Sequence, residues 1–234
     1  MTTTEGLERL VRREVRSPRS AALAGILFSL LMGTSMILLR TGAIVDPAKI
    51  DGEWLDTQSS AVAVVLVLIP FAGIAFLWFT GVMRDLLGEL EDKFFATVFL
   101  GSGIILVVMM FVWGAAFGAV FGTYQVVAGA LNDFDVFFYA TAFANQIIGN
   151  YFLRMASVYM LSIGSLWTRT KVVPRWLTIV TYIVALPFLL FAGALRWARF
   201  LFPAWVLMVS IFILILNFRL NQEREGDEEL TLEA

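Results

Sequence analysis

The segment AVAVVLVLIPFAGIAFLWFTGVM, residues 61–83, carries no charged side chain. The hydrocarbon core of a bilayer is about 30 Å thick, and a helix crosses it with roughly 20 apolar residues. This segment therefore predicts a membrane-spanning helix. Similar apolar runs recur along the chain and predict a bundle of six transmembrane helices, at residues 20–39, 60–83, 94–118, 137–167, 176–195 and 200–218.

The composition favours an all-α polytopic membrane protein whose first partner is the lipid bilayer. Hydrophobic residues make up 59% of the 234 positions and charged residues 15%, whereas soluble domains have about 45–50% and about 25%. The net charge of −2 argues against nucleic-acid binding, which needs a basic surface. Cysteine and histidine are both absent, so we expect no metal ion and no cofactor.

The distribution of Lys and Arg predicts the orientation, because cytoplasmic loops retain positive charge. If the N-terminus is cytoplasmic, the inner segments hold twelve of these residues and the outer segments hold four. We therefore expect both termini to be cytoplasmic. Residues 1–19 then form a basic amphipathic cytoplasmic segment, residues 20–218 the transmembrane domain, and residues 219–234 an acidic cytoplasmic tail.

Small residues recur at helical spacing in two regions of the chain. In lipid, helices associate through close packing of their backbones, which small side chains permit. We expect these residues to pack helices within the chain, with a homo-oligomer contact as the alternative. They are Ala21, Gly25, Ser29 and Gly33 in the first span, and Gly114, Gly118 and Gly122 at the end of the third.

The fourth span includes FANQIIGNYFLRMASVYM, residues 143–160, which is apolar yet contains an arginine. At about 100° per residue, the polar side chains of this span fall within about 80° of one another. We expect this polar stripe to point into the bundle and the opposite face to point to lipid. The stripe holds Tyr139, Gln146, Asn150, Arg154 and Ser157, and the opposite face holds Ile148, Phe152, Met155 and Leu166.

An arginine at the centre of a span costs about 2.5–3.5 kcal/mol on insertion scales, so it needs acceptors. Pro70 and Pro187 are helix kinks that interrupt the second and fifth spans at a similar depth. Each leaves the carbonyl four residues earlier, that of Leu66 or Ile183, without its helical donor. Arg154 is then a structural tie to these carbonyls, a site for an anionic lipid or a small anionic ligand, or the partner of a carboxylate from another subunit.

Two segments join charged loops to the ends of predicted spans. They are RDLLGELEDKFFATVFLGSG at residues 84–103 and LSIGSLWTRTKVVPRWL at residues 161–177. In these segments the chain resembles uncharacterised six-span bacterial integral membrane proteins. The resemblance covers most of residues 20–218 and implies a multi-pass protein of the bacterial cytoplasmic membrane, but it implies no activity.

Three classes of function remain. A small transporter or channel, which we favour, uses the polar site around Arg154 as a mid-membrane path. A non-catalytic accessory or scaffold subunit of a membrane complex uses the small-residue faces to hold a partner. An enzyme would need a partner or cofactor to supply acid and base groups, because no predicted span contains a carboxylate or a histidine. We therefore do not expect catalysis.

Overall fold

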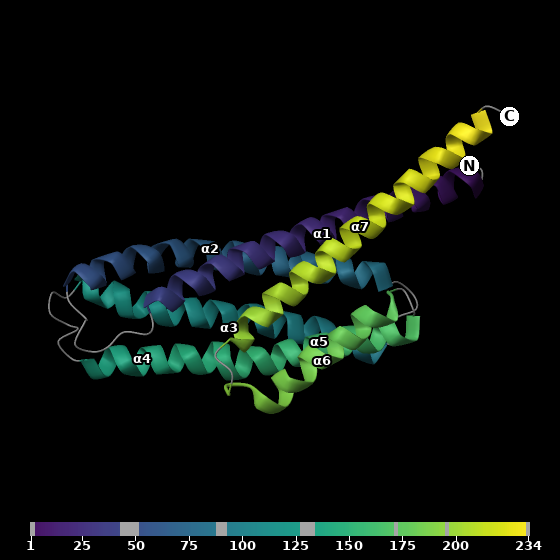
Figure 1. Cartoon of the computed structure of the whole chain (residues 1–234). Helices are drawn as coiled ribbons and strands as arrows, with labels where there is room; N and C mark the ends of the chain where they lie inside the picture. Colours follow the sequence, from purple (N-terminus) through teal and green to yellow (C-terminus); the bar gives the residue numbers. More distant parts are fainter. Residues whose placement is uncertain are drawn as a thin grey trace.

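The computed structural model describes residues 3–42, 52–87, 93–126, 134–170, 173–194 and 197–232, with side chains for most positions between residues 19 and 218. Every element in these ranges is helical, and Figure 1 shows them arranged lengthwise in one bundle. The elements are α1 (Thr3–Gly42), α2 (Gly52–Leu87), α3 (Lys93–Val126), α4 (Phe134–Gln146), the π-helical segment η4 (Ile147–Tyr151), α5 (Phe152–Thr170), α6 (Arg175–Phe191) and α7 (Ala198–Leu232).

Within the described ranges, four helices contain segments that are long and apolar enough to cross a membrane. These segments are Arg19–Leu39 of α1, Ser60–Arg84 of α2, Phe94–Ala119 of α3 and Ala198–Phe218 of α7. Helix α6 is a shorter apolar helix, and α4, η4 and α5 form one uninterrupted helical run. The all-helical prediction is confirmed for the described residues, and the four segments fit an integral membrane protein.

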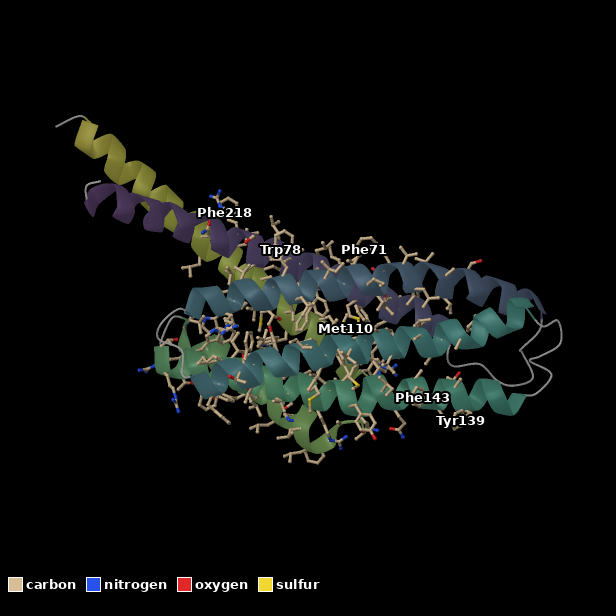
Figure 2. The ribbon with its side chains drawn as sticks, turned by 180° about the vertical axis from the view of Figure 1, so that it is seen from behind. Phe71, Trp78, Met110, Tyr139, Phe143 and Phe218 are labelled. Carbon is tan, nitrogen blue, oxygen red and sulfur yellow. The ribbon has the colours of Figure 1, made fainter. Side chains whose placement is uncertain are left out.

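Apolar side chains also cover the outside of the bundle. Phe71 and Trp78 of α2 and Phe143 of α4 are exposed and project from the surface in Figure 2. A soluble protein rarely leaves such large apolar patches in water, whereas lipid covers them at no penalty.

The order of the helices determines which side chains can meet. Helix α1 packs against α2 and α7, and α3 packs against α2 and the run from α4 to α5. Helix α6 packs mainly on α5 and touches α7. Because α2 and α6 are not neighbours, the predicted polar core between the second, fourth and fifth spans does not form.

Aromatic rings from five helices fill the centre of the bundle. Tyr159 of α5 lies 5.2 Å from Phe76 of α2 and stacks on Phe99 of α3 at 4.4 Å, measured between ring centroids. Phe28 of α1 lies 4.8 Å from Phe76 and 6.1 Å from Phe202 of α7. All five rings are completely buried. Pairs of this geometry contribute about 0.5–1.5 kcal/mol each beyond the burial of their surface.

The polar side chains described in this core are hydrogen-bonded to one another or to backbone carbonyls. The Thr80 and Tyr159 hydroxyls lie 3.0 Å apart and join α2 to α5. Trp205 of α7 donates its indole N–H to the Thr181 hydroxyl of α6 at 2.9 Å. Ser210 of α7 is the exception, because its buried hydroxyl makes no hydrogen bond within the described part of the chain.

Most of the predicted packing residues lie at helix contacts. A Cβ added at Gly25 would collide with Ser210 and Phe79, so α1, α2 and α7 approach one another closely there. Additions at Gly114 and Gly118 would meet Ile69 and Leu66 of α2. Ala21 is fully buried, and Ser29 donates its hydroxyl to the Gly25 carbonyl. Gly33 and Gly122 face open space instead.

Helix α1 continues without a break from Thr3 to Gly42. The backbone of residues 3–19, the described part of the predicted amphipathic segment, therefore continues in the same helix as the first predicted span. The extended ends of α1 and α7 leave the bundle at the same end (Figure 1). At their base, Arg19 donates to Asn217 at 2.7 Å, and its guanidinium lies 5.6 Å from the centre of the Phe218 ring. The side chains of residues 1–18 and 219–234 lie outside the described part.

Candidate functional site

The helical run 134–170 changes its winding in the middle. Residues Ile147–Tyr151 form a π-helical segment between the regular helices α4 and α5. A π-helical turn holds one more residue than an α-helical turn, and such turns are rare and concentrate at functional sites. Gly149 lies inside the segment, and a Cβ added to it would meet no atom within 4 Å.

The predicted faces of this span are reversed for most of its residues. Ile148, Phe152 and Leu166, which we expected to point to lipid, are buried against the bundle, and Met155 is half-buried. The reason is that an angular count groups residues onto one face but does not say which face meets the neighbouring helices, and here the apolar face meets them. The polar stripe lies on the outer side: Tyr139 and Gln146 are exposed, and Asn150 and Arg154 are half-buried.

A chain of hydrogen bonds links three residues of the stripe. Arg154 donates from Nη1 to Asn150 Oδ1 at 3.3 Å, and Asn150 in turn donates from Nδ2 to Gln146 Oε1. The three residues are spaced by four, so they lie one above another on the helix surface. Side chains on a helix lean toward its N-terminus, and the Arg154 side chain accordingly reaches back to Asn150. These two hydrogen bonds occupy the side-chain oxygens of Asn150 and Gln146. The polar groups that remain on the outer side are mainly N–H donors.

A turn between α6 and α7 covers Asn150. Gly193 in this turn has a φ of 87°, a conformation that side chains with a Cβ rarely adopt. A Cβ at this position would also collide with the Asn150 side-chain oxygen. Two requirements therefore select glycine at residue 193, its backbone angle and its contact with Asn150.

Arg199, in the first turn of α7, places a second guanidinium beside the same helical run. It donates from Nη1 to Asn145 Oδ1 at 3.5 Å and so joins α7 to α4. We name the five side chains around the turn the Arg154 cluster: Asn145, Gln146, Asn150, Arg154 and Arg199. From the sequence alone, Arg199 is one of the four charges assigned to the outer segments. Its position at the start of a span was the one available signal, and nothing in the sequence indicates its partner.

The remaining residues of the predicted stripe are not part of this cluster. Ser157 is fully buried and donates its hydroxyl to the Ala185 carbonyl of α6 at 2.8 Å, so it ties α5 to α6. Tyr139 is 75% exposed. Figure 2 shows it nearer the end of the bundle than Phe143.

The expected pairing of Arg154 with carbonyls freed by proline is wrong. Asn150 accepts the hydrogen bond that Arg154 makes within the described residues, and the carbonyls of Leu66 and Ile183 do not. Pro70 and Pro187 do lie inside helices α2 and α6, but both are exposed. The two helices are not packed together, so equal depth along the bundle does not bring them to the same residue.

The cluster is built to receive negative charge. A guanidinium has five N–H donors and no acceptor, and Asn150 takes one of those of Arg154. The ranges with described side chains contain no Asp or Glu at all, so no described carboxylate neutralises the cluster. A nucleophile paired with a general base, which catalysis of acyl transfer requires, is also missing among these side chains. The arrangement can bind an anion, and it offers no group for proton transfer.

The polar cluster thus combines two guanidiniums with two irregular features of the backbone, the π-helical segment and the Gly193 turn. No protein family, curated protein or solved structure matches this chain.

Proposed function

We propose that the protein crosses the cytoplasmic membrane of a bacterium six times, with both termini in the cytoplasm. The alternating directions of successive elements along the bundle support this topology (Figure 1). The run 134–170 and the shorter helix α6 then supply the two spans beyond the four long apolar segments. The excess of Lys and Arg in the loops assigned to the inside sets the direction.

We propose further that the protein is a small transporter whose anionic substrate binds at the Arg154 cluster. One observation carries this proposal: Arg154 is half-buried, is held by Asn150 and retains N–H donors that no described side chain accepts. An arginine in a span is expensive, and such residues usually mark a ligand or an ion pathway.

The irregular backbone around the cluster supports the same proposal. Membrane transporters commonly place their substrate sites where helices are interrupted, because irregular backbone is tolerated there and supplies polar groups. The π-helical segment and the Gly193 turn meet at Asn150. A path through the centre of the bundle is not supported, because buried aromatic rings occupy it. The route we propose runs along the outer surface of α5 beside α6 and α7.

Flux measurements in liposomes test this function. The purified full-length protein is reconstituted, and the entry of inorganic phosphate and acetate and the transfer of fluorescent phosphatidylglycerol between leaflets are measured. We expect at least one of these to exceed the rate of protein-free liposomes and to fall about tenfold or more in Arg154→Gln, the effect of losing a charged hydrogen bond.

Arg175→Gln is the matched control for this experiment. Arg175 is an exposed arginine at the opposite end of α6, so its loss should leave the rate unchanged. Thermal unfolding in detergent establishes that both variants fold. Equal rates in the wild-type protein, in Arg154→Gln and in protein-free liposomes would refute the transport proposal.

The second candidate function is an accessory subunit of a membrane complex. The aromatic packing of the bundle centre favours it, since a tightly filled core suits a protein that presents its outer surface to a partner. This function predicts a stoichiometric partner after mild detergent extraction from native membranes, and no Arg154-dependent flux by the protein alone.

A further inference from the structure

The surface beside the Arg154 cluster is strongly apolar. Tyr151 at the end of η4, Leu190 and Phe191 at the end of α6, and Trp197 before α7 each expose more than half of their side-chain surface. We name these four residues the apolar rim. The cluster is therefore bordered by side chains that belong in lipid, and it does not open into the bundle.

The depth of the cluster places it near one boundary of the hydrocarbon core. Asn150 lies seventeen residues from Trp167, at the opposite end of the same helical run, which corresponds to about 26 Å at 1.5 Å per residue. Arg154 reaches toward Asn150, so its guanidinium lies at a similar height. Arg199 lies eighteen residues from Asn217, or about 27 Å, by the same measure. A core about 30 Å thick puts both guanidiniums just below the headgroup region.

Guanidinium groups at this depth suit a lipid phosphate. They match phosphate oxygens with two parallel N–H donors and are more weakly hydrated than ammonium groups. We infer that the Arg154 cluster binds the phosphate of an anionic phospholipid, whose acyl chains lie against the apolar rim. This inference rests on the proposed function and names its substrate class, an amphiphile that enters sideways from the bilayer.

Two features favour a lipid over a water-soluble anion. A soluble anion would have to displace lipid from the apolar rim, where Leu190 and Phe191 offer it no hydrogen bond. A phospholipid satisfies both parts at once, because its phosphate meets the donors of Arg154 and Gln146 while its chains replace other lipid chains. The charge of the cluster is positive and no described carboxylate opposes it, so a net negative headgroup is preferred over a zwitterionic one.

Binding measurements on the full-length protein test this inference. The protein is placed in phosphatidylcholine nanodiscs with a few per cent of spin-labelled phosphatidylglycerol, and the immobilised fraction of the label is recorded by electron paramagnetic resonance. Spin-labelled diacylglycerol, which lacks the phosphate, provides the second arm. Inorganic phosphate and glycerol phosphate, added as competitors, provide the third.

We expect immobilised phosphatidylglycerol in the wild-type protein and in Arg175→Gln, and about tenfold or more weaker binding in Arg154→Gln. Asn150→Ala, which removes the acceptor that orients Arg154, should weaken binding less. It serves as the test if Arg154→Gln does not fold. Arg154→Lys should retain part of the binding, because the charge remains and the planar fork is lost.

Three results would overturn the inference. One is equal phosphatidylglycerol binding by the wild-type protein and Arg154→Gln, and another is equal immobilisation of diacylglycerol. The third is efficient competition by glycerol phosphate, which would indicate a soluble substrate. Arg154-dependent flux of inorganic phosphate or acetate without lipid binding would leave the transport proposal standing and refute only the lipid. Loss of both signals would refute both.

Discussion

The bundle centre and the Arg154 cluster hold helices together by different kinds of contact. In the centre, five helices meet through aromatic rings and glycines on regular helical backbone. At the cluster, helices meet through amide and guanidinium groups on backbone that departs from the α-helix at η4 and at the Gly193 turn. Both regions involve α5 and α7, and at the cluster Arg154 retains N–H donors that no described side chain accepts.

The difference indicates that the centre determines how the helices pack, whereas the cluster determines what the protein binds. In lipid, apolar helices gain little free energy from contact alone. The helices of the centre are therefore held by closely fitting side chains, which leave no space for an added atom. The cluster relies on directed hydrogen bonds, which tolerate small displacements but fail when one partner is removed. Substitutions in the centre should therefore change folding first, and substitutions in the cluster should change ligand binding first.

Replacing Gly25 with leucine should have the largest effect. The new side chain would collide with Phe79 and Ser210, where α1, α2 and α7 meet. Overpacking of a well-packed core costs about 1–3 kcal/mol and occasionally more. We expect most of the protein to aggregate on detergent extraction, as measured by size-exclusion chromatography. Gly33→Leu is the control, because Gly33 faces open space on the same helix. Equal losses in the two variants would contradict the packing argument.

Replacing Gly193 with alanine should have the next largest effect, now at the cluster. The positive φ costs about 1–2 kcal/mol for a residue with a Cβ, and the added carbon would displace Asn150. We expect a lower unfolding temperature together with weaker Arg154-dependent lipid binding. Gly149→Ala should change neither, since its Cβ meets no atom. Full lipid binding by a folded Gly193→Ala would show that the turn does not position Asn150.

The hydrogen bond between Thr80 and Tyr159 should contribute less. Such interhelical bonds in membranes contribute about 0.6–1.7 kcal/mol in double-mutant cycles. We expect Tyr159→Phe and Thr80→Val each to lower the free energy of unfolding, and the double variant to lose less than their sum. Reversible unfolding in mixed micelles measures all four proteins. Additive losses would mean that the 3.0 Å contact contributes no coupling, and lipid binding should be unchanged throughout.

The smallest effect, with the opposite sign, is expected for Ser210→Ala. The Ser210 hydroxyl is buried and makes no hydrogen bond to the described residues. Removing an unsatisfied buried polar group while nearly keeping the volume should stabilise the fold or leave it unchanged, by up to about 1 kcal/mol. A loss of more than about 1 kcal/mol, on the same scale, would indicate that the hydroxyl has a partner in the folded protein.

The bundle centre, with its regular helices, is the region that the sequence predicts. Uninterrupted apolar runs such as residues 61–83 locate the long helices, because the length and hydropathy of a segment can be read from consecutive residues of the sequence. The four-residue spacing of Gly114 and Gly118 likewise indicates a close helix contact, and the structure places α2 there. These signals follow from the helical period alone.

The geometry of the Arg154 cluster could not be predicted from helical spacing and hydropathy. The stripe around Arg154 was identified from the sequence, but its direction was predicted wrongly, because helical spacing groups residues on one face without indicating which face meets the other helices. Arg199 lies far from Asn145 in sequence, and their hydrogen bond depends on how α7 packs beside α4. Pro70 and Pro187 were paired by depth, although depth says nothing about which helices are neighbours. Such contacts depend on the arrangement of helices around the bundle axis, which a local pattern does not encode.

The ends of α1 and α7 leave the bundle at the same end (Figure 1), and this arrangement bears on whether the number of membrane crossings is even or odd. A chain that begins and ends on one side has crossed the membrane an even number of times, whichever compartment that side faces. A protease added to sealed vesicles should therefore shorten the protein at both tails or at neither. Opening the vesicles should then convert one result into the other, and trimming at a single tail would mean an odd number of crossings.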